Sequence, residues 1–222
     1  MIYLPVSWVL FLLLMGVLPF ILFGIALDVV ELAVAKLGFS PLVAFLLLVG
    51  VIVGSTINIP LYERVARVTL VPDFMEMWTG HFWGIPLRRI EQKTIVAVNV
   101  GGGVIPTGLA LYEWTRADPV ILLVVTVVVT TVSYFSAQVV PGIGIQMNAL
   151  VAPLTAAFMA LLVAGEMASS VAFAGGVLGV VIGADLLHLR EIERMTSGVI
   201  SIGGAGVFDG IALCGLMALL LT

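Results

Sequence analysis

Long apolar runs recur along the chain and constrain its fold more than any other feature. Each holds close to the roughly 20 residues that a helix needs to cross a hydrocarbon core of about 30 Å. Backbone polar groups inside a bilayer need partners within the protein, which favours helices for such runs. The sequence therefore predicts an all-α, polytopic transmembrane bundle of about seven spans, formed as a single domain from residues 1–222. The predicted spans cover residues 6–27, 41–59, 94–112, 119–139, 148–164, 167–188 and 198–221.

Composition agrees with a membrane protein and excludes several other classes. Hydrophobic residues make up 62% of the chain and charged residues 10%, whereas a soluble domain carries roughly 25% charged residues. The net charge of −4 is small, and no basic cluster resembles a nucleic-acid footprint. The single cysteine excludes an internal disulfide, and the two histidines lack metal-ligand spacing. We therefore expect the lipid bilayer as a partner, and neither nucleic acid, metal nor cofactor.

Basic residues are distributed unevenly between the links, which predicts an orientation. Seven lie in the links at 60–93 and after 188, and two lie in the opposite links. The positive-inside rule then places the N-terminus in the cytoplasm and the C-terminus outside. No basic residue precedes Lys36, so the first run is predicted to be a retained helix, not a signal peptide. The seven are Arg64, Arg67, Arg88, Arg89, Lys93, Arg190 and Arg194, and the two are Lys36 and Arg116.

The link at residues 60–93 mixes aromatic and basic residues, a combination typical of the headgroup layer. It is predicted to form one or two amphipathic interfacial helices, broken near residues 84–86. His81 fits such an interfacial segment better than a metal site, because His188 is the only other histidine.

Glycine and proline interrupt the apolar runs at several places. The stretch GGGVIP at 101–106 disfavours a regular helix, so the third span is predicted to be broken there. Two alternatives follow for this break: its freed backbone groups line a cavity, or its glycines only allow neighbouring helices to pack closely. The apolar segment at 139–154 is predicted to be re-entrant, and a stripe of glycines at 175, 179 and 183 to pack against span three or span five. The predicted cavity-lining residues are Asn99, Gly101, Gly102, Gly103 and Pro106.

Two carboxylates, Asp185 and Asp209, stand inside consecutive apolar runs and are the strongest chemical signal in the chain. Burying an ionisable group at mid-depth costs at least about 2.5–3.5 kcal/mol on insertion scales, so such groups usually face a bundle interior or a hydrated cavity. If the two share one site, they cannot both ionise easily. The ionised carboxylate is then a general base for water, and the protonated one donates to a carbonyl oxygen. The alternatives are an interfacial Asp185 near His188 and Arg190, and a buried Asp209 that caps a helix or bonds to the region of Asn99.

This arrangement resembles the presenilin and signal-peptide-peptidase class of intramembrane aspartic proteases. The family's GxGD motif has a counterpart in GAGVFD at 204–209, where the aspartate comes two residues later, and Ala184 replaces the tyrosine of its Tyr-Asp motif. The family's Pro-Ala-Leu motif is matched only by a displaced Asn148-Ala149-Leu150, earlier in the chain. The resemblance implies that Asp185 and Asp209 are catalytic. It also implies that Asn148, Ala149, Leu150, Gly204 and Gly206 contact the substrate.

Nearly the whole chain resembles a prokaryotic membrane family known as domain of unknown function 1614. The shared signatures are INIPL at 57–61, GGGVIP at 101–106, PGIGI at 141–145, GADLLHL at 183–189 and GGAGVFDGI at 203–211. This resemblance implies a multi-pass protein of the prokaryotic cytoplasmic membrane and implies no activity.

Three functions remain open from the sequence. The first is a presenilin-like protease that hydrolyses peptide bonds of membrane-embedded proteins or peptides with the Asp185–Asp209 dyad. The second is a proton- or cation-coupled transporter for small solutes, with Asp209 at a midplane site between broken helices. The third is a non-catalytic membrane scaffold. Carboxylates within hydrogen-bond reach of each other would favour the first.

Overall fold

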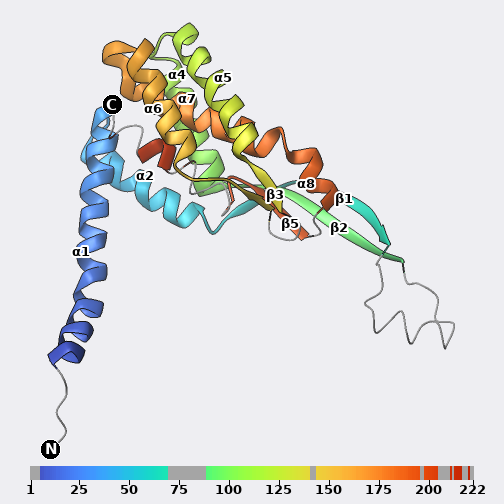
Figure 1. Cartoon of the computed structure of the whole chain (residues 1–222), viewed down its shortest axis with the longest axis horizontal. Coiled ribbons are helices and arrows are strands. Elements are labelled where there is room, and N and C mark those ends of the chain that lie inside the picture. Colours follow the sequence, from blue (N-terminus) through green and yellow to red (C-terminus); the bar gives the residue numbers. More distant parts are fainter. Residues whose placement is uncertain are drawn as a thin grey trace, which may run out of the picture.

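The computed structural model describes residues 6–69, 89–140, 144–195, 198–204, 211, 213–216 and 220. Within them the chain is mostly helical, as the apolar runs predict. The helices form a compact body from which one long N-terminal helix projects on one side and a β-hairpin on the other (Figure 1). The helices are α1 (Val6–Lys36), α2 (Pro41–Gly54), α4 (Ile105–Trp114), α5 (Pro119–Ser136), α6 (Val151–Val163), α7 (Ala168–Val180) and α8 (Leu189–Met195).

Local sequence accounts for where several helices begin. Ser40 precedes α2, and its side chain accepts a hydrogen bond from the backbone N–H of Val43. Asp118 does the same for α5, accepting from Val120 N–H at 2.8 Å and from Ile121 N–H at 3.3 Å. Each cap is followed by a proline in the first turn, where the missing N–H costs nothing.

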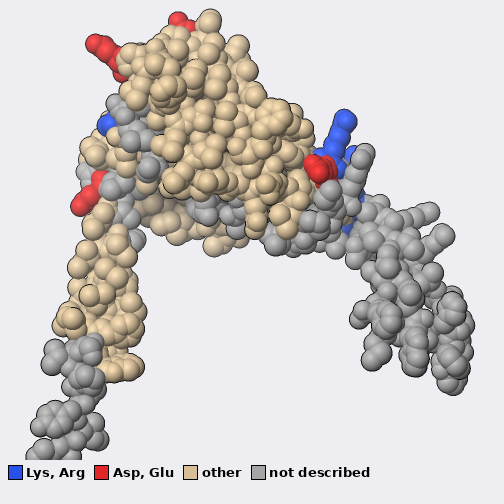
Figure 2. Space-filling view, in the orientation of Figure 1, with Lys and Arg blue, Asp and Glu red and all other residues tan. Residues whose placement is uncertain are grey.

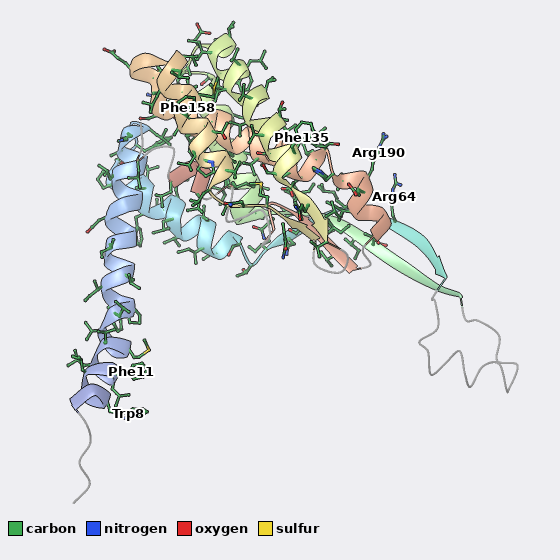
Figure 3. All side chains as sticks on the ribbon, in the orientation of Figure 1. Trp8, Phe11, Arg64, Phe135, Phe158 and Arg190 are labelled. Atoms are coloured by element: carbon green, nitrogen blue, oxygen red, sulfur yellow. The ribbon has the colours of Figure 1, made fainter. Side chains whose placement is uncertain are left out.

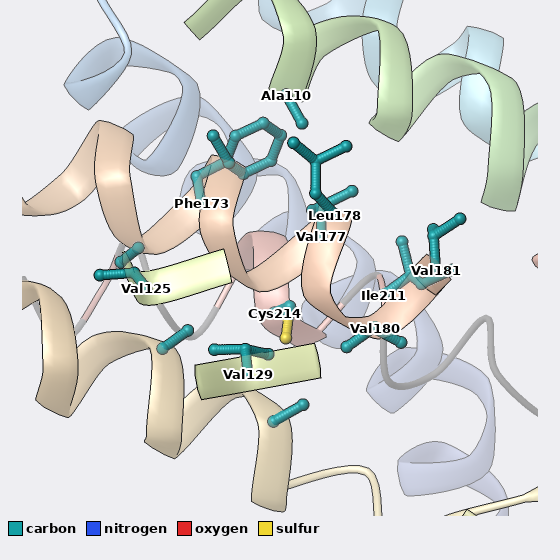
Figure 4. Close-up of a cluster of buried hydrophobic side chains, with 14 of the residues drawn as sticks. Ala110, Val125, Val129, Phe173, Val177, Leu178, Val180, Val181, Ile211 and Cys214 are labelled. Atoms are coloured by element: carbon teal, nitrogen blue, oxygen red, sulfur yellow. The ribbon is translucent and has the colours of Figure 1, made fainter. Parts of the chain in front are cut away.

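Helix α7 forms the centre of the body, packed by α4, α5 and α6. Ten consecutive residues of α7, from Val171 to Val180, are buried, which is the expected result for a helix that is apolar on every side. Its side chains gather with those of α5 and of the last described helical residues in one apolar cluster (Figure 4). The cluster includes Val125, Val129, Val177, Val180, Ile211 and Cys214.

The glycine stripe of α7 packs against α5, the fourth apolar run. The expectation of span three or span five was therefore wrong. A Cβ added at Gly175 would lie 2.8 Å from Val125 Cγ1, and one at Gly179 would lie 2.6 Å from Val129 Cβ. One added at Gly183 would overlap the backbone oxygen of Thr130. The absence of side chains at these three positions lets the two helices approach closely.

A three-stranded sheet corrects the all-α prediction. It consists of β1 (Asn58–Thr69), β2 (Arg89–Asn99) and β5 (Gly198–Ile202), in the order β1-β2-β5. β1 and β2 are antiparallel, and β5 joins β2 in parallel, with Thr94 opposite Gly198 and Val98 opposite Ile202. Residues predicted to open the third and seventh spans are thus strands. So are both ends of the predicted interfacial helices at 60–93, while His81 and residues 84–86 lie outside the described residues.

The physical reason for this correction is visible in the strands themselves. β2 reads RIEQKTIVAVN, and β5 reads GVISI. Both are rich in β-branched residues, which fit a pleated sheet better than a helix. A second, two-stranded antiparallel sheet pairs β3 (Gln138–Val140) with β4 (Gly144–Gln146), inside the segment predicted to be re-entrant.

The predicted break in the third span is confirmed. β2 ends at Asn99 and is followed by a π-helical turn, η1 (Val100–Val104), before α4 begins with Pro106 in its first turn. The chain therefore changes from strand to helix through the three glycines.

Within the described part of the chain, two helices are long and apolar enough to cross a membrane: Pro119–Ser136 and the continuous helical stretch Gly165–Ile192. The face of the helical body seen in Figure 2 shows few charged side chains, and those that it shows lie toward the ends of the body. Large apolar side chains also point outward, among them Trp8 and Phe11 on α1, Phe135 on α5 and Phe158 on α6 (Figure 3).

Candidate functional site

Asp185 lies in a second π-helical turn, η3 (Val181–Leu186), which continues α7. Its side chain is buried, and its Oδ2 accepts a hydrogen bond of 2.8 Å from the backbone N–H of Gly203. A carboxylate in an apolar interior requires such a partner, because an unpaired one would be strongly destabilised. Among the described residues, Oδ1 has no hydrogen-bond partner. One oxygen of Asp185 is thus fixed by Gly203.

The π turn determines which way Asp185 faces. Gly183, two residues earlier, packs against Thr130 and Ser133 of α5. Asp185 points instead to the end of β5, away from the glycine stripe. A π turn inserts one extra residue into the helix and shifts the faces of the residues that follow, which is why such turns are frequent at functional sites.

Gly203 occupies a position that only glycine fits. Its φ of 69° lies in the left-handed region, which side chains disfavour. A Cβ added here would lie 2.6 Å from both Gly102 C and Gly103 N, the two ends of one peptide bond. Gly203 therefore joins three elements. It directly follows β5, its N–H donates to Asp185 of η3, and its α-carbon packs against the backbone of η1.

Asn99 organises the opposite side of this junction. Its side-chain oxygen accepts from Gly102 N–H at 2.8 Å and so caps η1. Its amide nitrogen donates to Ser55 O at 2.8 Å and to Asn58 Oδ1 at 3.1 Å. Ser201 Oγ also donates to Asn58 Oδ1, at 2.6 Å. This polar network links the start of β1, the ends of β2 and β5, and the end of α2.

The predicted cavity-lining glycines are closely packed. Gly101 lies against the end of α2, where an added Cβ would overlap Val51 O and Ser55 N. A Cβ at Gly103 would lie 2.9 Å from Val98 Cγ2 and 3.1 Å from Ile202 O. Gly101, Gly102 and Gly103 are buried, and Pro106 is half-buried at the start of α4.

Asp209 and Gly206 lie outside the described residues, but the chain on both sides of them is described. Before them, Gly203 binds Asp185, and Gly204 N–H donates to Ser201 O at 3.0 Å. After them, Cys214 packs on Gly176 and Gly215 on Phe173, since Cβ atoms added at Gly176 and Gly215 would meet those side chains at 3.3 Å and 3.1 Å. Two segments of the seventh apolar run thus lie beside the sixth.

The remaining predicted substrate residues lie at the start of α6. Asn148 Oδ1 accepts from Leu150 N–H at 3.1 Å, in a turn that leads into the helix. Asn148 and Leu150 are exposed, and Ala149 is half-buried. Their described hydrogen bonds stay within this turn, so nothing in the described structure brings them to Asp185.

The sequence did not point to Asn58, Ser201 or Gly203 as participants in this junction, and it indicated His188 only as a neighbour of an interfacial Asp185. His188 is buried, and its Nδ1 lies 3.1 Å from the backbone oxygens of both Gly183 and Ala184. Its ring stacks on Tyr134 of α5, with 4.7 Å between ring centroids. The double glycine after the β-branched GVISI is the signal that marks a strand end followed by a tight turn. Within the described part of the chain, no three metal-ligating side chains come together.

The profile of a family described as protein of unknown function DUF1614 matches residues 52–221. The chain belongs to the DUF1614 family. The match includes the whole junction, from the end of α2 to the segment after β5. No curated protein and no solved structure matches the chain. The family assignment agrees with the signatures in the sequence.

Proposed function

We propose that this DUF1614 protein is an intramembrane aspartic protease in which Asp185 and Asp209 form the catalytic dyad. The observation that carries the proposal is the bond from Gly203 N–H to Asp185 Oδ2. It anchors a buried carboxylate to the start of the segment that leads to Asp209, six residues further along the chain. In this proposal the other oxygen of Asp185, Oδ1, faces a water or the second carboxyl group.

In this mechanism one aspartate is ionised and the other is protonated, because two adjacent carboxylates cannot both ionise easily. The ionised carboxylate removes a proton from water, whose oxygen attacks the peptide carbonyl carbon. The protonated carboxyl donates its proton to the carbonyl oxygen, which gives a gem-diol. Proton transfer to the amide nitrogen then breaks the C–N bond and yields an acid and an amine.

The sheet offers a way to present the substrate. In the order β1-β2-β5, the outer edge of β5 has no neighbouring strand within the described part of the chain. An extended substrate segment would add to this edge by backbone hydrogen bonds. Because β5 ends one residue before Gly203, such a segment would lead toward Asp185. Gly204 and Gly206 would then line its path, and Asn148, Ala149 and Leu150 would act further away.

The proposed setting is the prokaryotic cytoplasmic membrane, with several spans, the N-terminus inside and the C-terminus outside. Two observations support this orientation. Arg64 and Arg190, from two links predicted to be cytoplasmic, lie at the same end of the molecule (Figure 3). Arg116, predicted to be outside, donates to Leu37 O at 2.8 Å, beside Lys36, the other basic residue predicted there. With Cys214 replaced, a single cysteine at position 222 should be labelled by impermeant reagents from outside, and labelling from the cytoplasm alone would contradict the orientation.

The test of the activity is cleavage of a transmembrane substrate by purified protein in liposomes. Asp185→Asn and Asp209→Asn should each abolish cleavage, because a neutral amide cannot act as the base. Asp118→Asn is the matched control, since it makes the same chemical change at the cap of α5, where asparagine also caps well. Full cleavage by either dyad variant would refute the assignment.

A transporter is the second candidate, favoured by the buried π turn η1 and the polar network around Asn99. Broken helices with unpaired backbone groups are typical of transporter sites. In that case, Asp209→Asn would abolish solute uptake, whereas Asp185→Asn would change it little. Measuring uptake and cleavage on the same liposomes separates the two functions, and a scaffold would show neither.

A further inference from the structure

The turn that follows Asp185 is held by a side chain with no part in the proposed chemistry. η3 ends at Leu186, and a short turn at Leu187 and His188 connects it to α8. His188 folds back over this end, and its Nδ1 lies 3.1 Å from both Gly183 O and Ala184 O. These two carbonyls belong to the residues immediately before Asp185. His188 is therefore bonded to the backbone that carries the carboxylate.

The chemistry of these contacts fixes the histidine tautomer. Backbone carbonyl oxygens only accept hydrogen bonds, so Nδ1 must carry a proton and donate it. The ring is also stacked on Tyr134 of α5, with an angle of 27° between the planes. The stack on Tyr134 holds the His188 ring in place, and the hydrogen bonds from Nδ1–H hold the carbonyls of Gly183 and Ala184 against that ring. Through this pair of contacts, the end of η3 is tied to α5.

We infer that His188 is a positioning residue, whose Nδ1–H holds the η3 backbone so that Asp185 meets the N–H of Gly203. The inference rests on the proposed function for its effect on cleavage, but not for its effect on the Asp185–Gly203 bond. A histidine at this place gives the carboxylate a fixed direction without touching substrate. This role predicts that losing the δ donor of residue 188 weakens the Asp185–Gly203 bond beyond any effect of losing the ring.

Two substitutions separate the donor from the ring. Asparagine at position 188 places an N–H donor where Nδ1 stands, because both atoms are one bond beyond Cγ. Leucine has nearly the same shape as asparagine and no donor. Both variants lose the stack on Tyr134, so any difference between them reports the hydrogen bonds to Gly183 O and Ala184 O.

The first measurement is amide hydrogen exchange by NMR on 15N-glycine-labelled protein in micelles. The Gly203 N–H bonds to Asp185, whereas the neighbouring Gly204 N–H bonds to Ser201 O and serves as the internal reference. We expect Gly203 to exchange at least about tenfold faster, relative to Gly204, in His188→Leu than in His188→Asn, since each tenfold corresponds to about 1.4 kcal/mol of lost protection. Equal protection in the two variants would overturn the inference.

The second measurement needs no change at His188. In a His81→Gln background, the ring 15N shifts should show Nδ1 protonated in the neutral imidazole, and the opposite tautomer would overturn the inference even if the leucine variant fails to fold.

The third measurement is cleavage. His188→Leu should lower kcat by about 10²-fold with little change in KM, because a misplacement of about 1 Å costs that much. His188→Asn should have a higher kcat than His188→Leu, because it keeps the donor. A loss in KM alone would contradict positioning. If the exchange result is as expected and the unmodified protein cleaves nothing, the protease proposal fails and the positioning role of His188 stands.

Discussion

The close contact between α5 and α7 makes Gly179→Ala a sensitive test of how the body is packed. An added Cβ would lie 2.6 Å from Val129 Cβ, 2.7 Å from Val129 Cγ1 and 3.0 Å from Thr130 N. Carbon atoms pack at about 3.5–4.0 Å, so the helices would have to separate by about 1 Å at this level. Val129 Cβ is attached directly to the backbone, so no rotamer change can relieve the contact.

The expected magnitude follows from two opposing effects. Overpacking a close interface costs about 1–3 kcal/mol, and the rigid contact places this case near the upper end. Alanine recovers about 1 kcal/mol through its higher helix propensity. The net loss is therefore about 2 kcal/mol in the free energy of unfolding, or about 30-fold in the folding equilibrium.

The matched control is Gly108→Ala in α4. It makes the same chemical change on a helix of the same body, where no atom lies within 4 Å of the added Cβ. We expect this variant to be up to about 1 kcal/mol more stable than the unmodified protein. The assay is reversible unfolding by SDS titration of purified protein in mixed micelles, followed by circular dichroism and tryptophan fluorescence. Equal stability of the two variants would show that α5 and α7 are not in close contact.

Three further predictions concern the junction and the opposite end of the body. Asn99→Ala should cost about 2–3 kcal/mol in the same titration, because it removes the partners of the buried Gly102 N–H and the partly buried Ser55 O. Asn58→Ala, at an exposed position, should cost less than half as much, and equal losses would contradict this. Gly203→Ala should abolish both cleavage and the protection of the Gly204 amide, since the backbone of residue 203 is in the left-handed region and is packed on η1. A folded, active variant would contradict the close packing of Gly203 on η1. Arg116→Ala should cost about 1–2 kcal/mol, because it removes the cation that faces the fully buried Glu113. Glu113→Gln should cost much less, because the Arg116 left behind is half-exposed. The reverse order of stabilities would be inconsistent with this pairing.

The helical part of the fold follows from local features that any reader of the sequence can find. Apolar runs of helix length, Ser40 and Asp118 as caps, and prolines in the first turns all point to helices where the structure has them. The break at GGGVIP was equally predictable, because three glycines and a proline remove helix propensity and a donor within one short stretch. These are properties of single residues and their immediate neighbours.

The sheet was not predicted, although β2 and β5 carry the signal in their β-branched residues. Hydropathy over a window of about 20 residues hid it, because a buried strand and the start of a transmembrane helix are equally apolar. The parallel pairing of β2 with β5 joins residues about a hundred positions apart, and no local pattern records such a partner. The helix that receives the α7 glycine stripe was mistaken for the same reason.

The candidate site divides in the same way. From the sequence, Asp185 is a carboxylate that is costly to leave unpaired within an apolar run, although an interfacial place near His188 and Arg190 also remained open. Only the tertiary structure decided that its partner is the N–H of Gly203, that the π turn η3 aims it there, and that His188 holds the backbone beside it. The reason is physical: the energetic demand of a buried charge is a property of the residue, whereas the atoms that satisfy the demand come from strands and helices that meet only when the chain has folded.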